Sequence, residues 1–172
     1  LYMSQLPRAC GVDFGTSNST VGWLRPGVPA LIPLEDGRST LPSAVFFNAD
    51  ENSVSFGRAA IAEYLGGYEG RLMRALKSLL GTSLIDGHTE VLGRPLGFRD
   101  LLANFIAELK RRAELESGRG FQLAVFGRRG HFTHYDPRAD RRAQDTLAAH
   151  GRQGGFREVS FPFDPSGAAL HL

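Results

Sequence analysis

Residues 10–22 read Cys-Gly-Val-Asp-Phe-Gly-Thr-Ser-Asn-Ser-Thr-Val-Gly, and this stretch is the most informative part of the chain. A short apolar strand runs into Asp13, a polar turn follows over residues 15–18, and a second strand begins at Ser19. An acidic residue at a strand end can hold a hydrated cation, and a glycine turn exposes backbone N–H groups that can surround an anion. A nucleotide's phosphate tail and its Mg²⁺ need these two features close together.

Spacing alone leaves two interpretations of this stretch open. Gly, Ser and Asn are good turn residues, so a plain β-hairpin is the alternative to a phosphate loop. A Walker loop is excluded, because no Gly-Lys-Ser/Thr follows the turn. The triplet Asp13-Phe14-Gly15 also matches the metal-binding triplet of protein kinases, but no His-Arg-Asp loop precedes it.

A resemblance favours the phosphate loop. Residues 13–19 resemble the first phosphate loop of the actin-like ATPase superfamily, in particular that of the seventy-kilodalton heat-shock protein family, the DnaK-like chaperones. Further segments resemble the same family in the same order: residues 37–43, 54–60, 75–81 and 164–170. The Gly127-Arg128 step before His131-Phe132 is similar to the shorter, bacterial YegD-like branch of the family.

The resemblance implies an α/β fold, namely an actin-like ATPase (ribonuclease H-like) lobe. Its mixed β-sheet would be flanked by helices, and it would carry a small inserted α+β subdomain. We expect residues 9–36 and 118–172 to form the core subdomain, 37–117 the insertion, and 1–8 a tag or disordered start. The family's ATPase domain has two lobes with nucleotide between them, and only the first is matched here. We therefore expect a fragment from which the second lobe is absent.

Apolar periodicity and turn signals predict the elements individually. The predicted strands are residues 9–14, 19–24, 30–33, 44–47, 53–56, 122–126 and 158–161, with a weaker pair across 88–96. The predicted helices are residues 58–65, 71–80, 99–116, 136–150 and 165–172. The run Lys110-Arg111-Arg112 is interpreted as a solvated face near a helix C-terminus, where cations suit the helix dipole.

Composition limits the classes of function. The chain has 172 residues and a net charge of +2, which does not indicate a nucleic-acid partner. No stretch approaches the ~18 apolar residues of a membrane span, so no membrane partner is expected. The single cysteine, Cys10, excludes an intramolecular disulfide and is predicted to be a buried structural thiol. These features fit a reducing compartment, and a cytoplasmic location is expected.

The resemblance also implies roles for individual residues. Asp13 would orient Mg²⁺ through its water shell, and Lys77 would reach the γ-phosphate and the attacking water. The backbone N–H groups of Gly15, Thr16, Ser17 and Asn18, with the Thr16 hydroxyl, would hold the β- and γ-phosphates. Asp164 stands at the family's glutamate position and would help to hold the hydrated metal, although its side chain is one methylene shorter.

Simpler interpretations of these residues stay open. Lys77 could be an exposed helix lysine, and Asp164 before a proline could be only a helix N-cap. Arg129 replaces a family proline that belongs to the relay between nucleotide and substrate domain, so the relay is in doubt. His131 and His134 have no third ligand nearby in the sequence and are not expected to bind metal.

The expected function is the N-terminal lobe of a nucleotide-binding domain that binds ATP/ADP with Mg²⁺ and hydrolyses ATP slowly in the intact protein. The fragment alone is expected to be inactive. Client proteins and co-chaperones would bind through the part that is absent. Two alternatives remain: a degenerate member that binds nucleotide as a scaffold without turnover, and a sugar or acetate kinase of the same superfamily.

Overall fold

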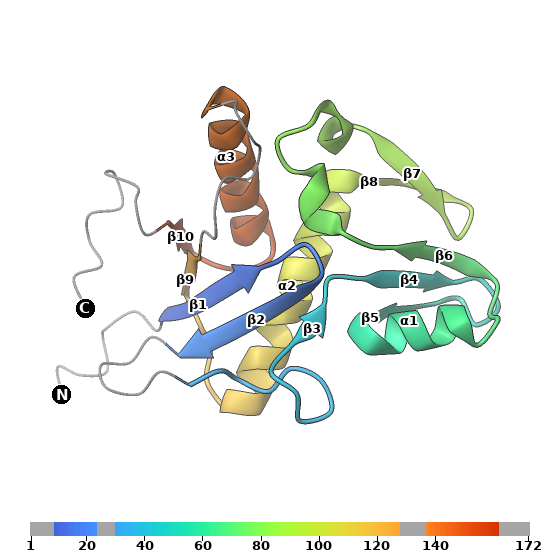
Figure 1. Ribbon diagram of the computed structural model, residues 1–172, viewed down its shortest axis with the longest axis horizontal. Helices are drawn as coiled ribbons and strands as arrows, with labels where there is room; N and C mark the ends of the chain where they lie inside the picture. Colours follow the sequence, from blue (N-terminus) through green and yellow to red (C-terminus); the bar gives the residue numbers. More distant parts are fainter. Residues whose placement is uncertain (1–8, 24–29, 128–136, 162–172) are drawn as a thin grey trace, which may run out of the picture.

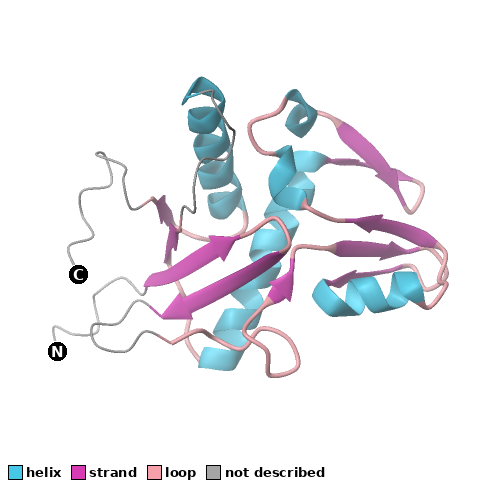
Figure 2. Cartoon of the chain, in the orientation of Figure 1, coloured by secondary structure: helices cyan, strands magenta, loops and turns pink. Residues whose placement is uncertain are grey.

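A computed structural model describes residues 9–23, 30–127 and 137–161 of the chain, with side chains from residue 141 onward in the last range. Its largest sheet has five strands in the order β10-β9-β1-β2-β3 (Figures 1 and 2). These strands are β1 (Ala9–Phe14), β2 (Asn18–Trp23), β3 (Leu41–Pro42), β9 (Leu123–Phe126) and β10 (Glu158–Ser160). The sheet is mixed, because β1 pairs antiparallel with β2 and parallel with β9.

Two helices, α2 (Phe98–Ser117) and α3 (Pro137–Gln153), pack on the same face of this sheet. The Phe14 ring lies 5.8 Å from that of Phe105 in α2. In α3, a Cβ added at Gly151 would lie 2.6 Å from Val159 of β10. Alternation along β1 buries Cys10, Val12 and Phe14 against these helices, so Asp13 faces the opposite side of the sheet.

The rest of the described chain adds two small sheets and a short helix (Figure 1). Helix α1 (Gly57–Leu65) packs on a three-stranded antiparallel sheet of β4 (Val45–Asn48), β5 (Ser53–Phe56) and β6 (Gly70–Met73). A two-stranded hairpin of β7 (His88–Val91) and β8 (Arg94–Gly97) follows two 3₁₀ turns, η2 (Leu76–Leu79) and η3 (Ser83–Asp86).

The helix predicted over residues 71–80 is wrong. The segment forms β6 and then the 3₁₀ turn η2. Two causes are visible. Residues 70–73 pair antiparallel with β4, and Ala75 adopts a left-handed conformation (φ 51°) that interrupts any helix. Strand pairing and the buried side chain of Leu76 therefore override the helical periodicity.

The strand predicted over residues 30–33 is reduced to a single bridge between Gly22 and Leu31. The sequence analysis also missed β3 and η3, which are too short to show a period. The β-strands near 9–14, 19–24, 44–47, 53–56, 122–126 and 158–161, the hairpin across 88–96 and the remaining long helices are confirmed to within a few residues. The expected helix at 165–172 lies outside the described residues.

The sequence-based prediction for Cys10 is confirmed. Its side chain is 1 % exposed, and burial raises the pKa of the thiol to about 12, with the nearby charge of Glu114 adding to the effect. None of the helices in the described ranges has the length and apolar character that crossing a bilayer requires.

Candidate functional site

The loop between β1 and β2 is a tight turn closed by the backbone. The Gly15 N–H donates to the Asn18 carbonyl at 3.0 Å. A Cβ at position 15 would lie 2.3 Å from that carbonyl oxygen, a distance that real Cβ atoms do not reach. The glycine is therefore required for close approach of the two backbone segments. The exposed part of the turn is Thr16, Ser17 and Asn18.

Ser43, directly after β3, fixes the orientation of this loop. Its N–H donates to the Ser17 carbonyl at 3.0 Å, and its hydroxyl donates to the Gly15 carbonyl at 2.9 Å. The same hydroxyl lies 2.9 Å from the Ser19 hydroxyl. A hydroxyl carries one proton, so the Ser19 hydroxyl is the donor in that second contact. Both serine side chains are buried, at 2 % and 0 % exposure.

The tip of the loop, residues 16–18, is exposed. Two loop carbonyls are engaged by Ser43, whereas the N–H groups of Thr16 and Ser17 donate to no group within the described part of the chain. Consecutive unpaired N–H groups in a turn form a concave site for an anion. The geometry fits a phosphate group, because donors are available and acceptors are turned away.

Asp13 lies two residues before Gly15 and stands opposite Thr20 in the β1–β2 ladder. Its side chain is half-buried and lies on the sheet face that α2 and α3 leave uncovered. A carboxylate beside exposed amides suits a hydrated Mg²⁺ on a phosphate, since Mg²⁺ keeps several waters and uses few protein ligands. The described residues contain no cluster of three or more potential metal ligands.

Lys77 lies in η2, which is anchored by its neighbour Leu76 in the same hydrophobic cluster as Phe14. The turn begins at Ala75, whose left-handed backbone is unusual for a residue other than glycine. Ser78 stabilises the turn by donating both its N–H (2.9 Å) and its hydroxyl (2.6 Å) to the Ala75 carbonyl. Such locally strained conformations cluster at functional sites. Lys77 is thus held on a defined turn and not along a helix.

The second candidate metal ligand, Asp164, lies outside the described residues, as do Arg129, His131 and His134. Of the residues singled out by the sequence, the structure places Asp13 and the Gly15–Asn18 turn together. Ser43 was not recognised as a loop-holding residue. Its only signal was its place at the end of the 37–43 segment.

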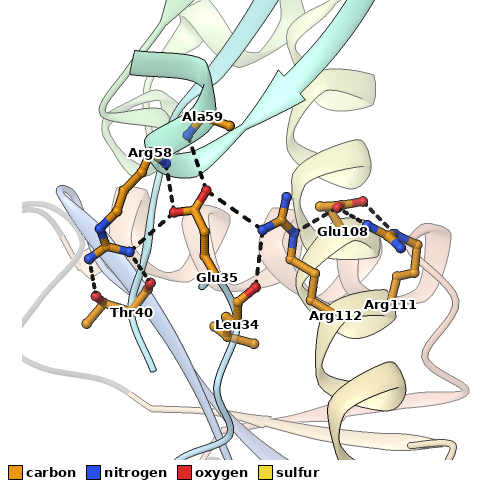
Figure 3. Close-up of polar contacts among 8 residues, drawn as sticks. All are labelled: Leu34, Glu35, Thr40, Arg58, Ala59, Glu108, Arg111 and Arg112. Atoms are coloured by element: carbon orange, nitrogen blue, oxygen red, sulfur yellow. Dashed lines mark hydrogen bonds and ion pairs between the residues drawn. The ribbon is translucent and has the colours of Figure 1, made fainter. Parts of the chain in front are cut away.

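A second polar site was also missed, and Glu35 is its centre (Figure 3). The buried carboxylate accepts hydrogen bonds at the start of α1, from the N–H groups of Arg58 (2.9 Å) and Ala59 (3.2 Å). It therefore caps a helix N-terminus, where negative charge is favoured. The Arg58 guanidinium adds a contact to Glu35 at 3.2 Å and two bonds to Thr40, at 2.7 Å to its carbonyl and 2.6 Å to its hydroxyl.

The same carboxylate reaches α2 through Arg112 (Figure 3). The Arg112 guanidinium lies 3.8 Å from Glu35, donates to the Leu34 carbonyl at 3.1 Å and donates to Glu108 at 2.8 Å. Burial alone would raise the pKa of Glu108, but hydrogen bonds from Arg111 and Arg112 outweigh it and lower that pKa.

The predicted solvated face at Lys110-Arg111-Arg112 is therefore largely wrong. Arg111 is exposed, but the side chains of Lys110 and Arg112 are each only 19 % exposed. Arg112 points toward Glu35, and Lys110 pairs with Glu114 at 2.5 Å. The helix lies over the Leu34–Glu35 segment, a tertiary contact that no spacing rule indicates.

These observations define a class of protein. The mixed sheet flanked by helices has the actin-like ATPase fold, with a glycine-containing loop between its first two strands. A model of the family described as Hsp70 protein matches residues 9–92, which run from β1 to the β7–β8 turn and include Asp13, the loop and Lys77. The match supports the Hsp70 family, its N-terminal lobe and a DnaK-like nucleotide-binding domain.

Proposed function

We propose that this chain is the first lobe of a DnaK-like nucleotide-binding domain that binds ATP or ADP with Mg²⁺ and hydrolyses ATP slowly in the intact protein. The observation that carries the proposal is the loop geometry. Thr16 and Ser17 present N–H groups without a partner in the described chain, while Ser43 holds the carbonyls of Gly15 and Ser17. The Hsp70 family match over the same residues supports it.

Each candidate residue then has one task. The amides of the Gly15–Asn18 turn that are not used within it, those of Thr16 and Ser17, bind the β- and γ-phosphates together with the Thr16 hydroxyl, and the Gly15 N–H closes the turn on Asn18. Lys77 neutralises the γ-phosphate and positions the attacking water. Asp13 and Asp164 hold the water shell of the metal. Bound Mg²⁺ supplies neutralisation of phosphate charge. Phosphoryl transfer depends mainly on such positioning and charge neutralisation.

The same proposal covers the wider organisation. Residues 9–36 and 118–172 form the core subdomain, and 37–117 form the insertion. The protein belongs to the YegD-like branch, acts in the cytoplasm as a chaperone, and meets its clients and co-chaperones through a second lobe and other parts outside this chain. The Glu35 cluster joins the two parts, because Glu35 of the core range binds the start of α1 and contacts Arg112 of α2, both in the insertion range.

The test measures Mg·ATP binding by calorimetry and single-turnover hydrolysis in the intact protein. Lys77→Ala is expected to retain binding and lose hydrolysis by about a hundredfold, since one positioned charge is removed from the transition state. The chain offers a matched control: Lys110→Ala removes the only other lysine, which pairs with Glu114 in α2, and should leave hydrolysis unchanged.

Asp13→Ala is expected to weaken the Mg²⁺-dependent part of nucleotide binding, and Asp145→Ala, on the exposed surface of α3, should not. Stoichiometric binding without hydrolysis in the wild type would indicate that the protein is a nucleotide-binding scaffold and not an ATPase. Hydrolysis that requires an added sugar or acetate would indicate a kinase. If no nucleotide binds at all, the loop is a plain β-hairpin without a role in phosphate binding.

A further inference from the structure

Residues 40–43 connect the two polar sites described above, and we call them the strap. One end of the strap is Thr40, whose carbonyl and hydroxyl accept hydrogen bonds from Arg58. The other end is Ser43, which is bonded to two carbonyls of the loop. Between them, Leu41 and Pro42 form β3 and pair with β2 opposite Ser19 and Asn18. The strap is thus held at both ends and along its length.

The Arg58 end is in turn set by Glu35. The carboxylate binds the backbone N–H of Arg58 and its guanidinium, so the side chain cannot turn away from Thr40 without losing an ion pair. Glu35 is 8 % exposed, and a charge at that depth that lost its partners would be costly. The start of α1, held by Glu35, therefore positions Thr40, and Arg112 of α2 reaches the same carboxylate at 3.8 Å.

The Ser43 end determines which groups the loop offers to a ligand. Its hydroxyl holds the Gly15 carbonyl, which cannot then point toward a phosphate. Without that hydroxyl, a peptide rotation can bring a carbonyl into the space where the amides now face, and an oxygen there repels an anion.

We propose that Ser43 and Arg58 are positioning residues for the nucleotide loop, and that the strap couples phosphate binding to the link between α1 and α2 that runs through Glu35. This inference rests on the proposed function. It adds a regulatory element to the same site: a partner or motion that shifts α1 relative to α2 changes nucleotide affinity through Thr40 and Ser43.

The experiment uses the intact protein and two readouts. Ser43→Ala is expected to raise the Kd for Mg·ATP about tenfold and to speed hydrogen exchange at the Gly15 amide by a similar factor, as one buried hydrogen bond is lost. Exchange at Val12, in the adjoining strand, should stay unchanged. Ser43→Thr keeps the hydroxyl and should restore both readouts.

The matched control is Thr89→Val. It also removes a buried hydroxyl, in β7, that has no partner among the described residues, and it should change neither readout. Arg58→Gln acts from the far end of the strap and should raise the Kd and the Gly15 exchange rate about threefold to fivefold. Arg99→Gln, which breaks the exposed pair with Asp86, is its control.

The two hypotheses fail in different ways. If the wild type binds no nucleotide but Ser43→Ala and Arg58→Gln both speed hydrogen exchange at the Gly15 amide, the proposed function is wrong. The role of the strap in holding the loop is then still supported. If nucleotide binds and both variants leave its Kd and the Gly15 exchange at wild-type values, the strap is overturned. Should Ser43→Ala fail to fold, Arg58→Gln alone decides the outcome.

Discussion

The carboxylate of Glu35 occupies the space that a side chain on Gly57 would need. A Cβ built on Gly57 would lie 2.9 Å and 3.0 Å from the two carboxylate oxygens, and 2.2 Å from Leu41. Gly57 also has φ +68°, a conformation that residues with a Cβ rarely adopt. The first residue of α1 is therefore glycine for two independent reasons, and the capping contact with Glu35 depends on it.

Gly57→Ala is predicted to destabilise the protein by about 2 to 4 kcal/mol, because it adds backbone strain and displaces the Glu35 carboxylate. Urea unfolding followed by circular dichroism measures the effect. Gly37→Ala is the control: φ is +75° there, but nothing lies within 4 Å of the added Cβ. That variant should be destabilised only by the backbone strain, roughly 1 kcal/mol. Equal losses in the two variants would contradict the packing argument.

Glu35→Gln is predicted to cost about 2 to 4 kcal/mol in unfolding free energy. The amide presents an NH₂ group to donors and leaves Arg58 and Arg112 without the charge that they face. The control is Asp86→Asn, which breaks an ion pair of 2.6 Å whose side chains are 69 % and 46 % exposed. Its expected cost is below about 1 kcal/mol. A Glu35→Gln loss no larger than the control's would show that the cluster is not stabilising.

The burial of His150 predicts that the folded protein loses stability at acid pH. The side chain is 2 % exposed at the packed α2–α3 interface, and neither ring nitrogen has a hydrogen-bond partner among the described residues. Burial, helped by the charge of Arg99 and opposed by the nearby Gln153 side chain and the charge of Asp100, lowers the pKa of His150 from its ordinary 6.5. Below pH 6.5 the unfolded chain binds a proton that the folded chain does not.

Stability should therefore fall as the pH drops from 6.5 to the lowered pKa of the folded state, by at most about 1.4 kcal/mol per pH unit from this group. Urea unfolding at several pH values measures the slope. His150→Leu should flatten it in that window, while His88→Gln, at an exposed histidine in β7, should not. An unchanged slope in His150→Leu would assign the acid sensitivity to other groups.

Cys10 should be inert in the folded protein. Its thiol is buried and its pKa is about 12, so both access and thiolate are lacking at pH 8. Iodoacetamide labelling followed by mass spectrometry should be at least about a thousandfold slower in buffer than in urea, since only unfolded chains react. Cys10 is the only cysteine, so Ser83→Cys provides an exposed comparison. Rapid native labelling at Cys10 would contradict its place in the core.

The sequence predicted those parts of the fold in which local pattern and tertiary packing agree. Alternation in β1 and the helical period around Phe105 identified their elements, because each buries one face. The helical period gave a wrong prediction for residues 71–80. There the chain pairs with the edge of β4 to form β6, and the left-handed backbone of Ala75 interrupts any helix. Nothing in the local composition distinguishes those two outcomes.

The site was predictable to the extent that it is local. Asp13 and the Gly15–Asn18 turn are contiguous, so their grouping follows from the sequence. The contacts of Ser43 with Gly15, and of Glu35 with Arg58 and Arg112, join residues far apart in the chain. They depend on strand order and on the placement of α1 and α2 around Glu35, which no spacing encodes.

The position of β1 between β2 and β9 has a consequence for synthesis on the ribosome. The β1–β2 hairpin can form early, but the other edge of β1 has no partner until β9, at Leu123–Phe126, has emerged. Phe14 likewise cannot pack against the Phe105 ring until α2 has been synthesised. An open strand edge with an uncovered apolar face invites pairing with other chains. A nascent chain that ended at residue 92 would be prone to aggregate, because β9 and α2, which pair with and cover β1, would not yet have been made.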